Sequence, residues 1–359
     1  MKKYYLLPLF LFFFIISFSQ KKKNSNDELK PSDLSALKFR SVGPAFMSGR
    51  IADIAINPEN ENEWYVAVGS GGVWKTINSG TTWKPITDDQ SFYSTGCITI
   101  DPNNSSKIWL GTGENVGGRH VGIGHGIYVS DNGGKNWKSM GLKSSEHISK
   151  IIVSPNDSNV IFVASQGPLW SSGGERGLFK TNDGGKSWNN VLNVNEWTGV
   201  TDIAIDKENP NILYAATWQR HRNVASYMGG GPGTSIYKSV DNGNTWSQIK
   251  NGLPKSNLGK IGLAISPFDS SILYAAVETD RRNGAVYKTT DSGGSWKKMS
   301  DTVSGATGPH YYQELVASPH VFDKIYLMDT KVQVSENGGE DFYVMNESDK
   351  HVDLSLIHI

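Results

Sequence analysis

The sequence predicts an all-β protein, a β-propeller of four-stranded blades. A turn motif, S/T-x-D/N-x-G-x-x-W/F, occurs six times, and its closing aromatic residues lie 46 to 58 residues apart. A repeat of that length is typical of units of four short strands. Between the motifs, β-branched and aromatic runs are broken by Pro, Asn and Gly, and no stretch has a sustained helical period. Because one such unit cannot bury both of its faces, neighbouring units must cover them.

Each repeat is expected to supply four strands and one tight hairpin. In the first repeat the strands are predicted at residues 51–56, 64–68, 72–76 and 81–86, with the turn motif between the third and the fourth. The Asp or Asn of the motif can bind backbone amides ahead of it, the Gly accepts a positive φ, and the aromatic ring is expected to pack beside the next unit.

The third residue of the motif is the one that could bind a metal ion, because it is acidic in part of the repeats. Three of the six copies carry Asn there, and none has the dense oxygen ligands that calcium prefers. We therefore expect a structural role, and no metal ion or cofactor. The six residues are Asn78, Asn132, Asp183, Asp241, Asp291 and Asn337.

The first residues predict export. Residues 1–19 have two lysines, a short apolar run and a Ser-Phe-Ser cleavage site, as in a signal peptide. The alternative is an uncleaved anchor, but the apolar run is short for a bilayer and contains Pro8, so we expect no membrane span after cleavage. Residues 20–36 are polar and lysine-rich and are predicted to be a disordered linker. The predicted location is secreted, periplasmic or in the cell envelope.

The composition excludes some classes of partner. Thirty-five basic residues balance 35 acidic ones, so no overall charge favours nucleic acid or a membrane surface. Cys97 is the only cysteine, which excludes a disulfide framework within the chain. It lies in an apolar stretch without an adjacent base and is expected to be a small buried strand residue.

The propeller is predicted to cover residues 37–353. Residues 350–353 look like the start of a seventh inner strand, so we expect six repeats and a truncated seventh. Residues 354–359 leave the repeat pattern and match the translation of a transposon end used in sequencing adapters. We expect an adapter-derived tail, with the rest of the protein's own chain as a missing partner; the alternative is a natural edge strand.

The repeats resemble a known group of proteins. With their Asp-box turns they look like BNR-repeat propellers, among them sialidases, tandem-propeller xyloglucanases and the sortilin-type domain. The likeness is strongest to the sortilin-like N-terminal propeller of large secreted bacterial proteins often labelled glycosyl hydrolase. The stretches that carry it are residues 39–44, 48–51, 109–115 and 215–220. Such propellers host many unrelated functions.

The resemblance supplies two tests for catalysis. Xyloglucanases place a catalytic aspartate just before paired glycines, but residues 68–72 read Val-Gly-Ser-Gly-Gly here, and the second carboxylate of those enzymes comes from a second propeller. Sialidases use an arginine triad and a Tyr–Glu pair; Arg50, Arg176 and Arg220 with Tyr312 and Glu314 are conceivable, but the arginine motif of the first strand is missing. Enzyme activity, that of a glycoside hydrolase if any, therefore stays open. The main expectation is a binding or scaffold module for a glycan or peptide, and the alternative is the N-terminal half of a tandem-propeller glycoside hydrolase.

The candidate site lies on the face opposite the turn motifs. There the second-to-third and blade-to-blade loops are long, and loops on a rigid scaffold commonly carry function. A mixed polar and aromatic mouth suits a carboxylated sugar, a polysaccharide or a peptide terminus. Alternatively, the arginines pair with acids and line a channel. His120 and His125 have no third ligand and do not predict a metal site. The candidate ligand-binding residues are Glu114, Arg119, Arg176, Trp218, Arg220, Arg222, Tyr311 and Tyr312.

Overall fold

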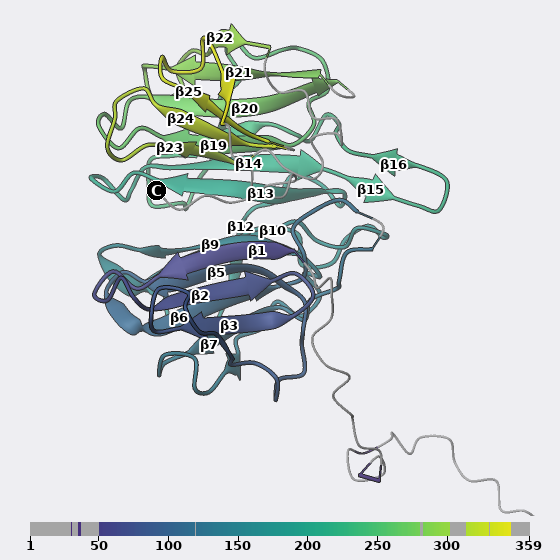
Figure 1. The fold of residues 1–359 in the computed structure, drawn as a ribbon. Coiled ribbons are helices and arrows are strands. Elements are labelled where there is room, and N and C mark those ends of the chain that lie inside the picture. Colours follow the sequence, from purple (N-terminus) through teal and green to yellow (C-terminus); the bar gives the residue numbers. More distant parts are fainter. Residues whose placement is uncertain are drawn as a thin grey trace, which may run out of the picture. The chain divides into compact units, whose positions relative to one another are not determined.

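The computed structural model describes residues 30, 35–36, 50–118, 120–280, 283–301, 314–329 and 331–345. The chain divides into two units, residues 1–46 and 47–359, and every described strand belongs to the second. This unit consists of six four-stranded sheets arranged as the blades of a propeller (Figure 1). The predicted all-β propeller of four-stranded blades is confirmed. Within the described residues no helix is long and apolar enough to cross a membrane.

The blades follow one another along the chain. Blade 1 consists of β1 (Ile51–Ile56), β2 (Trp64–Val68), β3 (Gly72–Thr76) and β4 (Lys84–Pro85). Blade 2 consists of β5 (Thr95–Asp101), β6 (Asn104–Thr112), β7 (Ile127–Ser130) and β8 (Lys138–Ser139). Blade 3 consists of β9 (Ile148–Ser154), β10 (Asp157–Ser165), β11 (Gly177–Thr181) and β12 (Asn189–Leu192). Blade 4 consists of β13 (Thr198–Ile205), β14 (Leu213–Gln219), β17 (Ile236–Ser239) and β18 (Ser247–Gln248). Blade 5 consists of β19 (Ile261–Ile265), β20 (Leu273–Asp280), β21 (Asn283–Thr289) and β22 (Lys297–Ser300). Blade 6 consists of β23 (Leu315–Ala317), β24 (Ile325–Met328), β25 (Val332–Ser335) and β26 (Tyr343–Val344). Blade 4 carries an additional hairpin, β15 (His221–Arg222) and β16 (Tyr227–Met228).

Within each blade the strands form an antiparallel meander from the centre outwards. In blade 1, Ile54 pairs with Val66, and Val66 pairs with Trp74 of the third strand. The fourth strand is shorter than predicted, since it begins at Lys84 and not at residue 81. The turn motif causes this difference, because the amide of Thr82 still donates to Asn78 Oδ1 (2.9 Å) and is not available to the ladder.

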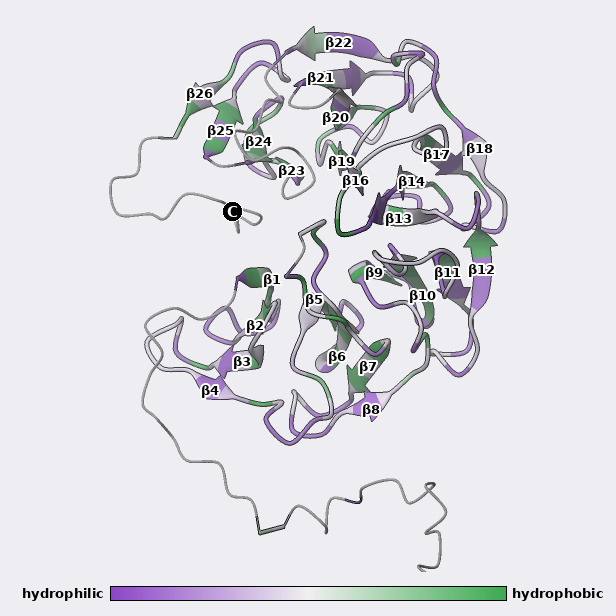
Figure 2. Ribbon diagram, turned by 90° about the vertical axis from the view of Figure 1, so that its right-hand side faces the viewer, coloured by the Kyte–Doolittle hydropathy of each residue, from purple (hydrophilic) through white to green (hydrophobic). Residues whose placement is uncertain are grey.

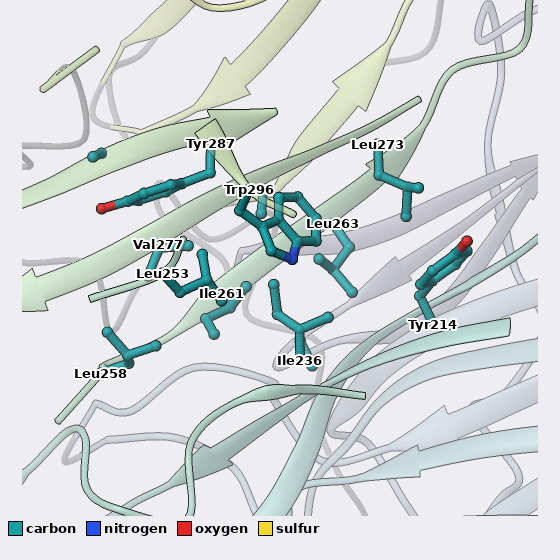
Figure 3. Packing of buried hydrophobic residues seen from close by; sticks show 13 residues of the cluster. Tyr214, Ile236, Leu253, Leu258, Ile261, Leu263, Leu273, Val277, Tyr287 and Trp296 are labelled. Atoms are coloured by element: carbon teal, nitrogen blue, oxygen red, sulfur yellow. The ribbon is translucent and has the colours of Figure 1, made fainter. Parts of the chain in front are cut away.

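The core lies between blades, where alternate residues of neighbouring sheets interdigitate. Between blades 4 and 5, Tyr214 and Ile236 of one blade pack with Leu263, Leu273 and Trp296 of the next (Figure 3). Comparable clusters join the other successive pairs from blade 1 to blade 6. Burial of alternate strand residues on both faces of a blade is the main stabilisation of a propeller.

The turn motifs form the predicted hairpins. In all six copies the hydroxyl of the first Ser or Thr accepts the amide of the motif glycine, at 2.8 to 3.0 Å. In blade 4, Asp241 also accepts the hydroxyl and the amide of Thr245, which lowers the pKa of Asp241 to about 2. The carboxylates of Asp183 and Asp291 likewise accept hydrogen bonds from hydroxyl groups of their own turns. Cys97 is buried in β5, and burial raises the pKa of its thiol.

Several predictions concern residues outside the described part of the chain. They are the signal peptide, most of the linker, the start of a seventh blade and the adapter-derived tail.

Candidate functional site

The two ends of the blades differ in their loops. The amide of Ser79 in the first turn motif donates to Asn62 O in the β1–β2 loop, so these two turns share one end. The amide of Gly69, after β2, donates to Arg50 O before β1, at the other end. We call this second end, with the second-to-third and blade-to-blade loops, the long-loop face. The hairpin β15–β16 extends from blade 4 on this face (Figure 1).

Glu114, after β6 of blade 2, carries the best-defined carboxylate of the long-loop face. Its side chain is 5% exposed, and Oε1 accepts Arg50 Nη2 at 2.8 Å. Oε2 accepts the amide of Gly122 at 3.2 Å. Arg50 Nη2 also lies 2.7 Å from His120 Nε2, so this imidazole joins the cluster. Arg50 and the Gly122 amide thus bind one nearly buried carboxylate, and His120 binds Arg50 in turn.

Gly69 makes this position of Glu114 possible. A Cβ at residue 69 would lie 2.4 Å from Glu114 Oε1 and 2.7 Å from its Cγ. Any larger residue would have to displace the carboxylate, because such contacts are far below van der Waals distance. The side chain of Glu114 therefore fills the space that a side chain at residue 69 would occupy.

Three candidate arginines that the structure describes, Arg176, Arg220 and Arg222, do not bind Glu114. Each donates to backbone carbonyls: Arg176 to Gln166, Pro168, Ser171, Gly173 and Trp197; Arg220 to Val116 and Gly167; and Arg222 to Gly117. All three are buried. Burial lowers the pKa of Arg220 to about 9 and that of Arg176 to about 10, so both stay protonated at neutral pH. The alternative of arginine–carboxylate pairs lining a channel is not what these three side chains do.

Trp218 is also buried, at 1% exposure, and is not a platform for a sugar in this structure. Its Nε1 donates to Gly229 O at 2.8 Å, and the Arg220 guanidinium lies 5.2 Å from its ring centroid. Among the described aromatic residues of this face, Tyr93 is 63% exposed and Trp170 is 42% exposed, whereas Trp197 is partly buried and packs on His221 at 4.4 Å between centroids.

The remaining candidates are distributed differently. Arg119, Tyr311 and Tyr312 lie outside the described residues. His125 is exposed on the blade 2 loop. Within the described ranges no three His, Cys, Asp or Glu side chains gather as a metal site requires.

Sequence reasoning missed three kinds of residue. The sequence pattern did not indicate that Gly69 leaves room for Glu114. It also did not indicate His147 and Gln166, which bind the backbone carbonyls of Glu114 and Asn115. Trp197 was overlooked in a blade-to-blade loop. The signal available was weak: a polar residue directly before or after an apolar strand, such as His147 before β9, is commonly held by a neighbouring loop.

A separate cavity of about 160 Å³ lies between the inner strands of the blades. Its charged lining consists of Asp53, Lys150, Asp202, Lys260 and Glu314. Lys150 Nζ binds Asp202 Oδ1 at 2.7 Å, and Lys260 Nζ binds Glu314 Oε1 at 3.1 Å. Each of these two ion pairs in the cavity thus joins a lysine of one blade to an acid of the next.

No family model matches the sequence. A xyloglucanase from a Paenibacillus species is 23% identical over 301 residues, which are 76% of this chain and 28% of that protein. The structure of an ancestral GH74 enzyme matches with a TM-score of 0.60 at 22% identity, over 82% of this chain and 38% of that one. A GH74 xyloglucanase from Xanthomonas campestris matches with a TM-score of 0.58 at 15% identity, over 83% and 45%.

Xyloglucanases are homologues of this chain. The likeness to the solved structures shows the fold, and the sortilin-like assignment stays a prediction. This chain spans about a quarter of the length of the xyloglucanases it matches, so their whole activity does not transfer with the similarity.

Proposed function

We propose that this chain is an exported, glycan-binding propeller that forms part of a glycoside hydrolase of the xyloglucanase type. In this proposal Glu114 is the carboxylate that the long-loop face presents to the glycan. The homology to xyloglucanases supports the substrate class, and it favours the hydrolase alternative over a binding module of unrelated function.

The position of Glu114 against Gly69 carries this proposal. The resemblance places a xyloglucanase aspartate just before the paired glycines, which here are Gly71 and Gly72, so the equivalent position is the exposed Ser70. Glu114 Oε1 would lie 2.4 Å from a Cβ at Gly69, so a carboxylate from blade 2 lies against the residue directly before that position. Arg50 and the Gly122 amide hold this carboxylate in one orientation. A glycoside hydrolase needs a second carboxyl group across the scissile bond, which we assign to the rest of the protein.

The described arginines favour a neutral glycan over a carboxylated one. Recognition of a carboxylate commonly uses a free bidentate guanidinium. Arg176, Arg220 and Arg222 are buried on backbone carbonyls, and Arg50 already binds Glu114. The exposed ring of Trp170 offers an apolar face on which a sugar ring can stack.

Calorimetric titration of the chain with xyloglucan oligosaccharides, polygalacturonate and a mixed peptide library tests this proposal. We expect binding to the neutral oligosaccharides, no release of reducing ends by this chain alone, and a loss of affinity of about tenfold or more in Glu114→Gln, because bonds to a charged group contribute about 1.5–3 kcal/mol. Glu61→Gln, at an exposed glutamate on the opposite face, is the matched control and should bind as the wild type does. Binding confined to polygalacturonate or peptide would overturn the proposal, and so would an affinity for xyloglucan that is unchanged in Glu114→Gln.

A further inference from the structure

We propose that His147, Gln166, Arg220 and Arg222 are positioning residues that fix the Glu114 carboxylate by holding the backbone behind it. The proposed role in ligand binding rests on the function proposed above, whereas the mechanical role does not. It gives the two buried arginines of blade 4 a function other than contact with a ligand.

Four successive carbonyls of the blade 2 loop each accept a side-chain donor from another blade. Glu114 O lies 2.8 Å from His147 Nδ1, and Asn115 O accepts Gln166 Nε2 at 3.2 Å; both donors belong to blade 3. From blade 4, Arg220 Nη1 donates to Val116 O at 3.1 Å, and Arg222 donates to Gly117 O from Nε at 3.1 Å and from Nη2 at 2.8 Å. We call these four donors the carbonyl clamp.

The carbonyl clamp replaces the strand pairing that this loop lacks. Residues 113–118 lie outside the strands, and a buried carbonyl without a donor costs about 1–3 kcal/mol. The four donors are all buried, with exposures from 0 to 8%. A carbonyl can only accept, so Nδ1 of His147 carries a hydrogen. Burial lowers the pKa of His147 to about 3, which leaves the imidazole neutral at neutral pH.

The donors are in turn fixed by their own neighbours. Gln166 Nε2 also donates to Thr201 Oγ1, Arg220 donates to Gly167 O and lies over Trp218, and the Arg222 guanidinium lies 4.4 Å from the Tyr227 centroid. Residue 117 must be a glycine for the loop to lie this close to Tyr227, since a Cβ there would lie 2.3 Å from Tyr227 Oη. The loop therefore has one well-defined path across blades 3 and 4.

This path determines where the Glu114 carboxylate points. Gly122 N and Arg50 Nη2 reach the carboxylate only while residue 114 keeps its place, and misplacement of a functional group by about 1 Å can cost two orders of magnitude in function. Release of Gly117 or Val116 would let the segment move without any change in the residues that touch the ligand.

Arg222→Met and Glu114→Gln, alone and combined, test the proposal in the full chain. Hydrogen exchange of the peptide spanning residues 114–122 reports the mechanical role, and calorimetric titration with xyloglucan oligosaccharides reports its effect on the site. We expect at least tenfold faster exchange in Arg222→Met, a loss of affinity of about tenfold, and no further loss when Arg222→Met is added to Glu114→Gln. Arg222→Lys, which keeps one donor, should restore part of both effects.

Lys180→Met is the matched control, because Lys180 is also a buried cation on a backbone carbonyl but binds Asn242 O on the opposite face. It should leave hydrogen exchange at residues 114–122 and the affinity for xyloglucan oligosaccharides unchanged.

If Arg222→Met does not fold, Gln166→Leu replaces it in the same cycle. Unchanged exchange at residues 114–122 would overturn the carbonyl clamp, and equal losses of affinity with and without Glu114→Gln would overturn its action through Glu114. A wild-type chain that binds no glycan would overturn the function proposed above, while the exchange measurement would still decide the mechanical role.

Discussion

Blade 1 and blade 5 share one sequence pattern but bury it differently. The third-strand and motif aromatic residues of blade 1, Trp74 and Trp83, are 37% and 39% exposed. Their equivalents in blade 5, Tyr287 and Trp296, are each 4% exposed and pack with residues of blade 4 (Figure 3). These aromatic residues therefore belong to the interface with the preceding blade, and the prediction that the motif ring packs beside the next unit is wrong. The same residue type is buried where another blade precedes it and exposed in blade 1.

The clusters of the described residues show where this interface is missing. They join blades 1 to 6 in sequence, and among the described residues none contains side chains of both blade 6 and blade 1. In Figure 2, β1–β4 and β23–β26 lie at the two ends of the arc of blades. A seventh blade between them would cover Trp74 and Trp83, and it stays a prediction.

Replacement of the two motif tryptophans by alanine should give the largest difference between the blades. We expect Trp296→Ala to lower the free energy of unfolding by about 3–5 kcal/mol, as for other buried Trp→Ala changes, and Trp83→Ala to lower it by about 1 kcal/mol or less. Urea unfolding followed by circular dichroism measures both. Equal losses in the two variants would show that the face of blade 1 is covered in solution, and would contradict the difference in burial between Trp83 and Trp296.

The fold was largely predictable because its signals are local. The turn motif contains its own hydrogen-bonding partners within five residues, so six hairpins could be placed from the sequence, with only the start of the fourth strand misjudged. The roles of the site residues were not predictable in the same way. Arg222 donates to a carbonyl 105 residues away, and Trp218 is buried by loops of the same face, so neither role is visible in the local sequence.

A second contrast between blades concerns the inner strands and gives a pH dependence. Asp53 in blade 1 accepts the amides of Ile54 and Ile98, and Asp202 in blade 4 accepts those of Ile203 and Leu263. Asp202 in addition forms a salt bridge with Lys150. Burial raises the pKa of Asp53 to about 6 against an ordinary value of 3.8, despite its two amide partners.

Between pH 4 and 6 the folded state therefore holds a proton on Asp53 that the unfolded chain has released. The stabilisation from this group is present below about pH 4 and is lost as pH rises to about 6, with a slope of at most about 1.4 kcal/mol per pH unit. Unfolding free energies of the wild type and Asp53→Asn, measured from pH 3.5 to 7, should show the advantage of the wild type shrinking as pH rises. A difference that stays constant or grows would contradict the assignment, and Asp202→Asn provides the parallel control.

The smallest expected effect concerns the lysines that hold the turns of interior blades. Lys180 Nζ of blade 3 binds Asn242 O at 2.6 Å and Asn244 Oδ1 at 2.9 Å in the turn of blade 4, and Lys238 Nζ of blade 4 binds Ser292 O at 2.9 Å in the turn of blade 5. Among the described residues, no lysine from a preceding blade binds the turn at residues 78–82 of blade 1. The bonds described for that turn are its own, such as Gly80 N to Thr76 Oγ1, and two from Ser79 to Asn62 in the β1–β2 loop.

Lys180→Met should accordingly make the turn of blade 4 behave like the turn of blade 1. We expect a loss of about 1 kcal/mol, near fivefold in local opening, because the two bonds from the Lys180 ammonium are removed while the bonds within the turn remain. Hydrogen exchange of residues 241–245 and 78–82 measures this directly: exchange at 241–245 should be slower in the wild type and should approach that of 78–82 in the variant. If residues 78–82 already exchange as slowly as 241–245 in the wild type, a neighbouring segment holds the first turn, and the exposure of blade 1 does not describe the protein in solution.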